Sequence, residues 1–185
     1  MLNTSANIKE PGLNLLPPGV ERYTVNGGGL TGIQILPDDE IEIINNEGNQ
    51  ICEISVFNKD GKSEPAILNL KENKDASEIK KILSKKDESS LVALRQLKKR
   101  NLDILKSKSS IVFDKDTGWG EKLKIKSKDK CYCIFAAPGA EMLIHEQNPP
   151  TDLTIFVKRA KITKDKEHHV IPDPMFDPLS ETNID

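Results

Sequence analysis

Residues 32–57 (GIQILPDDEIEIINNEGNQICEISVF) contain three short segments in which apolar side chains recur at every second position. Ile33 and Ile35 show this alternation in the first segment, and the turn-forming runs 37–39 (PDD) and 45–49 (NNEGN) separate the three segments. A period of two between turn signals is typical of β-strands. The sequence therefore predicts three consecutive antiparallel strands joined by tight turns.

The third segment, residues 50–57, carries apolar residues on both of its faces. Cys52 and Val56 share one face, whereas Glu53 and Phe57 share the other, because alternate residues of a strand point to opposite sides. A strand that is apolar on both faces is typical of the middle of a buried sheet. A carboxylate on such a strand lies either at the rim of the sheet or in a site, so Glu53 is a candidate site residue.

Residues 75–106 follow a different pattern, with apolar residues at helical spacing. Residues 75–78 (DASE) resemble a capping box, and Ile79, Ile82 and Leu83 follow them on one face. A second apolar stripe consists of Leu91, Leu94, Leu97, Leu102 and Leu105. The predicted fold class is therefore mainly β, an antiparallel sandwich or distorted barrel with a helical insertion at about 75–106.

Charge is divided unevenly between two parts of the chain. Residues 37–64 contain two lysines against eight acidic residues, a net charge of −6, and residues 71–108 contain 12 basic against six acidic residues, a net charge of +6. We expect the two segments to attract each other within one molecule or between copies, so a homo-oligomer is a further expectation. The helical segment lacks aromatic residues for base stacking, and we predict no nucleic-acid partner.

The chain divides by composition into a flexible lead-in (1–17), a single β-rich domain (18–161) and a proline-containing linker or tail (162–185). No apolar run approaches the roughly 20 residues that span a bilayer, and the N-terminus lacks the pattern of a secretory signal. We therefore predict a cytoplasmic protein with no membrane partner.

The three cysteines are Cys52, Cys131 and Cys133. An odd number without a secretory signal favours reduced thiols. Cys131 and Cys133 share one face of a predicted strand, and neither they nor His145 have the spacing of a zinc site. We interpret the cysteines as buried structural thiols and predict no metal site.

The segment 141–152 (EMLIHEQNPPTD) gathers several polar side chains in one loop, because its two adjacent prolines exclude a regular central strand. Glu141, His145 and Asp152 are acid–base candidates by residue type, and Gln147 lies between them. Loop carboxylates are also common turn acceptors, so no catalytic residue is assigned.

Two blocks of the sequence resemble known families. PPGVERYTV and QICEISVFNKDG resemble the urea-carboxylase-associated family. AAPGAEMLIHEQNPPTDLTIFVKRA and VIPDPMFDPLSE resemble the N-terminal region of aminomethyltransferase-like proteins, in which such a module precedes a folate-binding domain of the glycine-cleavage T-protein type. Together the blocks lie within residues 17–61 and 134–181.

The resemblance implies an accessory ligand-binding or docking module of an aminomethyltransferase-like one-carbon system, not catalytic alone. Its ligand would be a small amine or carboxylate, and this chain would hold no cofactor. Tetrahydrofolate would bind in an associated aminomethyltransferase-type catalytic domain. The candidate ligand-binding residues are Gln50, Cys52, Glu53, Asn58, Glu141, His145, Gln147 and Asp152.

The alternative is a small metabolite-binding protein or enzyme of the urea-carboxylase-associated family. In that case Glu53, Glu141, His145 and Asp152 are the acid–base candidates. An enzyme should bring Glu53 and the 141–152 loop together around one site, whereas a docking module does not require this.

Overall fold

The computed structural model describes residues 16–139 and 149–161, except for the side chain of Ser89. The predicted lead-in and tail lie almost entirely outside these residues. The strands are β1 (Val20–Val25), β2 (Leu30–Ile35), β3 (Glu40–Asn45), β4 (Cys52–Asn58), β5 (Ser109–Phe113), β6 (Lys122–Lys126), β7 (Cys131–Ala136) and β8 (Leu153–Lys158). The α-helices are α1 (Glu78–Ser84) and α2 (Glu88–Lys99), and the 3-10 helices are η1 (Pro65–Leu68) and η2 (Ile104–Lys106).

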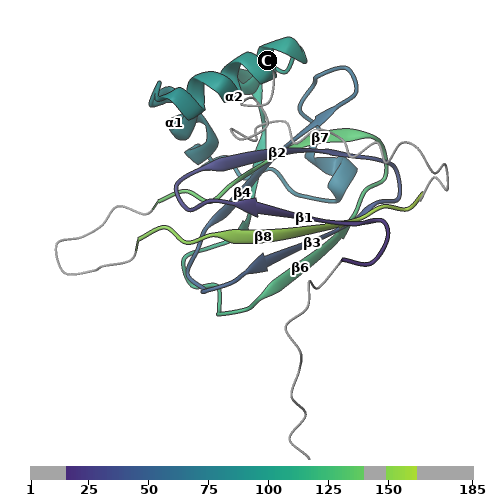
Figure 1. Cartoon of the computed structure of the whole chain (residues 1–185). Coiled ribbons are helices and arrows are strands. Elements are labelled where there is room, and N and C mark those ends of the chain that lie inside the picture. Colours follow the sequence, from purple (N-terminus) through teal and green to yellow (C-terminus); the bar gives the residue numbers. More distant parts are fainter. Residues whose placement is uncertain (1–15, 140–148, 162–185) are drawn as a thin grey trace, which may run out of the picture.

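The strands form two four-stranded antiparallel sheets that pack face to face (Figure 1). Sheet 1 has the order β1-β8-β3-β6, and sheet 2 has the order β2-β7-β4-β5. The chain changes sheet at every connection between successive strands except the one from β4 to β5, which contains the helices. This strand order is that of a jelly roll. The predicted antiparallel sandwich with a helical insertion is confirmed.

The prediction that β2, β3 and β4 pair with one another through tight turns is wrong. β2 pairs with β7, β3 pairs with β6 and β8, and β4 pairs with β5 and β7. The turns contain left-handed residues such as Asp38 (φ 67°) and Asn49 (φ 56°), and they carry the chain across to the opposite sheet. Alternation of side chains identifies a strand but does not identify its neighbour. The interior position predicted for β4 is confirmed, since it lies between β7 and β5.

The main core lies between the two sheets and consists of their inward-facing side chains. Ile33 and Ile35 of β2 face Ile41 and Ile43 of β3, and all four are at most 1% exposed. Burial of one such side chain contributes roughly 1.5–3 kcal/mol. The period-two pattern of the sequence therefore corresponds to the core face of each sheet.

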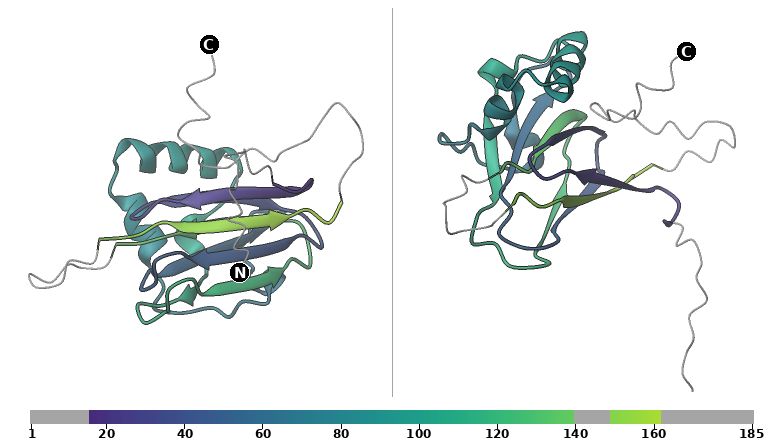
Figure 2. Two further views of the ribbon diagram at one scale, coloured as in Figure 1. Left: turned by 60° about the horizontal axis from the view of Figure 1, so that its bottom comes forward. Right: turned by 60° about the vertical axis from the view of Figure 1, so that its left-hand side comes forward.

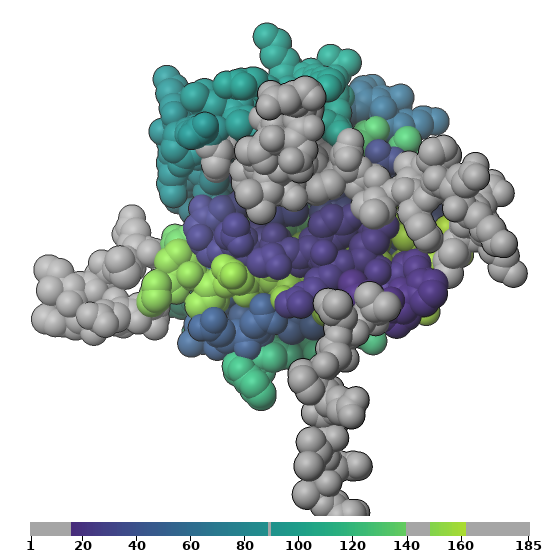
Figure 3. Space-filling model, in the orientation of Figure 1, coloured from purple at the N-terminus to yellow at the C-terminus, as the bar shows by residue number. Residues whose placement is uncertain are grey.

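The helices cover the outer face of sheet 2 (Figure 2). A second apolar cluster joins Phe57 of β4 and Ile134 of β7 to the helical layer. Its members from the helices and the segment that follows α2 are Ile79, Ile82, Leu83, Ala93, Leu97, Leu102 and Ile104. In Figure 3 the residues of β1 (purple) and β8 (yellow-green) lie at the surface below the helices, with no helix over them.

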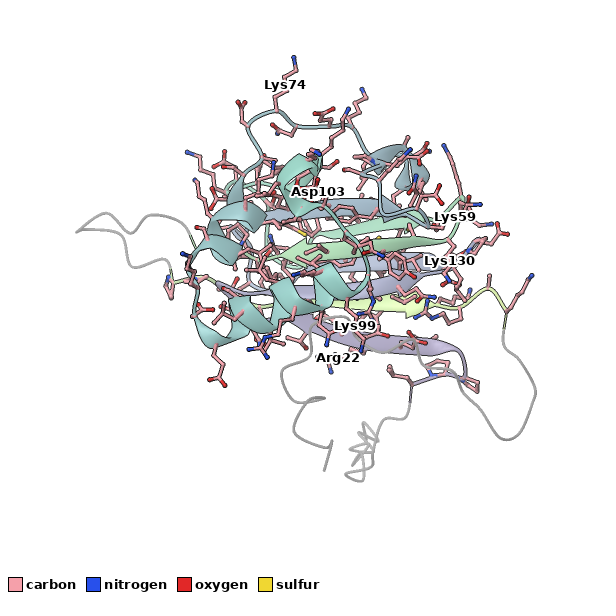
Figure 4. All side chains as sticks on the ribbon, turned by 90° about the horizontal axis from the view of Figure 1, so that it is seen from above. Arg22, Lys59, Lys74, Lys99, Asp103 and Lys130 are labelled. Atoms are coloured by element: carbon pink, nitrogen blue, oxygen red, sulfur yellow. The ribbon has the colours of Figure 1, made fainter. Side chains whose placement is uncertain are left out.

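The acidic strand β3 does not pair its charges with the basic helices. Glu42 pairs with Lys124 (3.4 Å) and Glu40 with Lys158 (3.7 Å), both within sheet 1. Within the molecule Glu40 and Glu42 therefore do not reach the basic helices, because the antiparallel register places lysines of β6 and β8 beside them. Attraction between the two charged segments of different copies stays a prediction. Lysines outside the sheets extend into solvent, as Lys74 does in Figure 4. In the described part of the chain, no helix is long and apolar enough to cross a membrane.

Candidate functional site

One end of the sandwich, which we call the Gln50 end, gathers the loops at residues 26–29, 46–51 and 114–121 with the segments that flank residues 140–148. At this end β3 and β7 finish and β4 and β8 begin. Here the structure joins the two sequence blocks on which the candidate residues lie.

Gln50 is the residue that connects them. Its side-chain amide donates to the carbonyl oxygens of Ile51 (2.8 Å) and Pro138 (2.9 Å), and its Oε1 accepts from the backbone N–H of Thr151 (2.7 Å). The residue is 4% exposed, and both N–H bonds of its amide are used. Gln50 is therefore a clamp that fixes Pro138 and Thr151 on the two sides of the 140–148 segment.

Asp152 and Asn46 extend this clamp. Asp152 Oδ1 accepts from the backbone N–H of Gly27 (2.8 Å), and Asn46 donates to the Asp152 carbonyl oxygen (3.1 Å). A Cβ atom at Gly27 would lie 2.3 Å from the Pro150 carbonyl oxygen, so no side chain fits at this position. Asp152 acts here as a turn acceptor, which was the structural alternative for this loop residue.

Glu53 differs from these residues because its hydrogen bonding is incomplete. The residue is 0% exposed, its Oε2 accepts from the backbone N–H of Glu78 (2.7 Å), and its Oε1 has no partner among the residues that the structure describes. A buried acceptor without a partner costs about 1–3 kcal/mol, and more when it is charged. A buried acceptor without a partner is rare in native folds, and a role in function is one explanation for it.

The strand register places Glu53 in an apolar row across the outer face of sheet 2. Its direct neighbours are Ala136 on β7 and Ile111 on β5, and Ala136 is in turn opposite Leu30 on β2. The pairing of β4 with β5 shifts between Cys52 and Glu53, which is a β-bulge. Bulges often re-aim a side chain next to a site, so the backbone irregularity falls at the same residue as the unpartnered oxygen.

Glu53 also replaces the predicted cap of α1. The capping box predicted at residues 75–78 is wrong, because the N-cap residue is Ser77 and its side chain makes no cap hydrogen bond. The carboxylate from β4 accepts from the first helical N–H instead. A tertiary contact thus caps α1 in place of the local capping motif, and it connects the helical layer to Glu53.

Cys52 and Asn58 have structural positions. Cys52 lies in the core between the sheets, where burial, reinforced by the charge of Glu53, raises the pKa of its thiol well above the ordinary value. Asn58 closes the turn at the far end of β4 by donating to Glu64 (2.8 Å) and accepting from the N–H of Lys62 (3.0 Å). The Cys52 side chain is therefore part of the core, and Asn58 lies at the end of β4 away from Gln50.

Three further candidates, Glu141, His145 and Gln147, lie outside the described residues. Their convergence with Glu53 stays a prediction. The described part contributes one observation, which is that the segment reaching Pro138 follows directly from Ala136, the cross-strand neighbour of Glu53.

All three cysteines are free and buried, as the interpretation as structural thiols predicts. The Sγ atoms of Cys131 and Cys133 are 3.6 Å apart on β7. Hydrogen bonding from Cys133 and Ser127 lowers the pKa of Cys131, whereas burial raises the pKa of Cys133. Within residues 16–139 and 149–161, no group of three or more His, Cys, Asp or Glu residues is placed to hold a metal ion.

The sequence analysis missed a charged cluster at the opposite end of the sandwich, the Arg159 end. Arg159 donates from Nε to Glu21 Oε1 (2.8 Å) and from Nη1 to Asp39 Oδ2 (2.6 Å), and Tyr23 donates to Glu21 Oε2 (2.7 Å). Asp39 also accepts from the N–H groups of Leu36 and Ala160. The single arginine after the apolar strand β8 was the available signal, because buried ion pairs favour arginine over lysine.

Burial lowers the pKa of Arg159, but hydrogen bonds and charge attraction from Glu21 and Asp39 outweigh it, and the pKa is raised. The pKa of Tyr23 is also raised, first by burial and then by the hydrogen bond and charge of Glu21. The cluster is a satisfied structural network.

No family model matches this chain. A trimethylamine-oxide aldolase from Ruegeria pomeroyi (strain ATCC 700808 / DSM 15171 / DSS-3) is 31% identical to it over 178 residues, which cover 96% of this chain and 22% of that protein. The chain thus spans about a fifth of the length of the curated relative that it matches.

This similarity corrects the functional interpretation drawn from the sequence. The relative is an aldolase, so the resemblance to an aminomethyltransferase or glycine-cleavage T-protein module is wrong, and so is the non-catalytic docking role that followed from it. The alternative that placed the chain among enzymes agrees better with the comparison. The expectation that tetrahydrofolate binds in an associated domain rested on that resemblance. The residues that the structure describes do not test it.

Proposed function

We propose that this chain is a β-sandwich unit of an enzyme of the trimethylamine-oxide aldolase type, and that its ligand is a small methylated amine oxide. The observation that carries the proposal is the 31% identity over 96% of the chain. A match of this extent includes both sheets and the helical insertion rather than a single motif. It supports a shared fold and a shared part in the enzyme.

The chemistry of such a reaction defines what a site must provide. Cleavage of trimethylamine oxide into an aldehyde and an amine balances as formaldehyde and dimethylamine. One C–N bond breaks, the oxygen passes from nitrogen to the former methyl carbon, and one methyl hydrogen passes to nitrogen. Carbon is oxidised and nitrogen is reduced within one molecule, so no external oxidant is needed.

An amine oxide carries a positive nitrogen surrounded by methyl groups and a negative oxygen. A carboxylate in apolar surroundings is suited to the nitrogen side, because a low dielectric strengthens the attraction. Glu53 has these properties, with Ala136 and Ile111 beside it and Oε1 without a partner among the described residues. Glu53 is the residue that we assign to the ligand cation.

Gln50 and Asp152 have a different part in this proposal. Their hydrogen bonds hold the segments that flank residues 140–148, and so they position whatever that segment contributes. They are positioning residues, because their observed bonds go to backbone groups.

Binding tests the proposal most cleanly, because the chain spans about a fifth of its relative. Isothermal titration of the purified chain with trimethylamine oxide should show binding, and Glu53→Gln should weaken it at least tenfold. Glutamine keeps an oxygen to accept the Glu78 N–H, so the fold should remain. The matched control is Glu42→Gln, a carboxylate of the exposed face of sheet 1 that pairs with Lys124.

Turnover is a second readout. Formaldehyde release from trimethylamine oxide should fall in Glu53→Gln and stay unchanged in Glu42→Gln. Absence of both binding and turnover in the wild-type chain, or equal binding by wild type and Glu53→Gln, would contradict the proposal.

A further inference from the structure

The loop between β5 and β6 exposes the one tryptophan of the chain. Trp119 is 82% exposed, although its loop is firmly held. The Asn49 N–H donates to the Thr117 carbonyl oxygen (2.7 Å), the Gly120 N–H donates to the Asn45 carbonyl oxygen (2.8 Å), and Glu121 accepts from Gly118 (3.0 Å). An exposed indole on an ordered support is pre-organised for recognition, and tryptophan is enriched among residues that dominate binding energy.

The C-terminal end of α2 borders a shallow, open apolar hollow of about 560 Å³. Its apolar lining comes from Leu94, Leu97, Leu102, Ile104 and Leu105, and Lys98 lies beside them. Leu105 is 80% exposed, an unusual position for a leucine beside other apolar side chains. A hollow of this kind is suited to an aromatic side chain, which gains free energy chiefly by burying apolar area.

The charges around the tryptophan and around the hollow are opposite. Residues 114–121 contain three acidic residues and one lysine, a net charge of −2, whereas residues 94–106 contain five basic residues and one aspartate, a net charge of +4. Lys98 is part of the hollow itself. Opposite fields steer two surfaces toward each other and favour one orientation.

The tryptophan and the hollow lie at opposite ends of the sandwich. The backbone N of Trp119 packs against Gly48, before the start of β4, whereas the carbonyl oxygen of Asn101 packs against Gly61, after its end. β4 has seven residues, so it separates the two places by roughly 20 Å at 3.3 Å per residue. Trp119 therefore does not reach the hollow of its own molecule.

We propose that the chain associates head to tail with a second copy, in which Trp119 of one molecule enters the α2 hollow of the next. A contact between two different surfaces of the same chain is heterologous, so it produces either a closed ring or an open filament. The occupant of the hollow is a second copy because the chain itself carries a complementary side chain and a complementary charge. This contact goes beyond the ligand proposed above and does not depend on it.

Trp119 itself reports on the contact, since the chain contains no other tryptophan. Its fluorescence emission should shift to shorter wavelength as the protein concentration rises, together with an increase in mass by analytical ultracentrifugation. Added salt should weaken the association, because charges near the surface are screened. Constant emission from a monomer over the accessible concentration range would overturn the proposal.

Two variants then separate the two halves of the contact. Trp119→Ala removes the inserted side chain, and Leu105→Glu places a negative charge in the hollow. Each residue is at least 80% exposed, so neither substitution should affect folding. Each variant alone should associate at least tenfold more weakly than wild type.

An equimolar mixture should restore one interface, because Leu105→Glu retains the tryptophan and Trp119→Ala retains the hollow. The mixture should stop at a heterodimer. The matched control is Leu91→Glu, an exposed leucine of α2 outside the hollow, which should associate like wild type. Association of Trp119→Ala alone at wild-type strength, or a mixture that stays monomeric, would overturn the proposal.

Discussion

The two ends of the sandwich hold buried charge in different ways. At the Arg159 end, two carboxylates surround one guanidinium, and backbone N–H groups complete the bonding of Asp39. At the Gln50 end, Glu53 has one backbone N–H on one oxygen and no partner on the other among the described residues. The first end is a hydrogen-bonded network, whereas the second leaves one carboxylate oxygen without a partner among the described residues, and we propose that this oxygen binds the ligand.

The largest loss of stability is expected at the Arg159 end. Arg159→Met should lower the free energy of unfolding by about 3–5 kcal/mol, because removing one partner of a buried pair leaves Glu21 and Asp39 uncompensated. Urea denaturation measures this change. Arg22→Met, on an exposed position of β1, is the control and should change stability by less than about 0.5 kcal/mol. Equal stability of the two variants would remove the basis for calling this end structural.

A smaller loss is expected at Gln50. Gln50→Ala leaves the Pro138 carbonyl and the Thr151 N–H without their partner, and each unsatisfied group costs about 1–3 kcal/mol before water reaches it. We expect a loss of about 2–3 kcal/mol in urea denaturation. Faster amide exchange at Thr151, with unchanged exchange at Arg159, should accompany it. A uniform increase in exchange along the chain would contradict the assignment of Gln50 as a local clamp.

Tyr23, at the Arg159 end, makes the stability of the fold depend on pH. Its pKa is raised by burial and by Glu21, so the folded state resists ionisation of the phenol. The unfolded chain ionises near its ordinary pKa of about 10. Above that pH the unfolded state binds fewer protons than the folded state, and stability therefore falls as the pH rises.

Below a pH of about 10 this contribution is fully present. Tyr23→Phe should lose about 1 kcal/mol at neutral pH with the hydrogen bond to Glu21. It should also show a weaker decline of stability in alkaline solution than wild type does. Urea denaturation at several pH values measures both effects, and parallel curves for the two proteins would contradict the role of Tyr23.

The smallest effect on stability is expected at Glu53. Glu53→Gln should change the free energy of unfolding by less than about 1 kcal/mol, because the amide oxygen still accepts the Glu78 N–H and a buried charge is removed. A group retained for function is often neutral or costly for stability. A loss as large as that of Arg159→Met would show that Glu53 belongs to a structural network.

Several of these features could be predicted from the sequence. The alternation in residues 50–57 identified an interior strand and placed Glu53 on it, and the helical spacing in residues 75–106 located the insertion. These are local patterns, which depend on the direction of successive side chains. The sheet partners of β2, β3 and β4 could not be predicted in this way, because many pairings satisfy the same alternation.

The charged cluster at the Arg159 end shows the same limit. Glu21, Asp39 and Arg159 lie up to 138 positions apart, and they meet because β8 pairs with β1 on one side and with β3 on the other. Likewise, the capping box expected at residues 75–78 was replaced by a carboxylate from β4. Long-range contacts of this kind depend on topology, which the short-range sequence pattern does not contain.

One titration tests the difference between the two ends most directly. Amide chemical shifts of the isotope-labelled chain should be followed by NMR as trimethylamine oxide is added, with Glu53→Gln as the matched sample. We predict shifts at Glu53, Glu78 and Ala136 in the wild-type chain, no shifts at Arg159, and loss of the response in Glu53→Gln. Shifts centred on the Arg159 end, or a response that Glu53→Gln retains in full, would contradict the assignment of the Gln50 end as the ligand site.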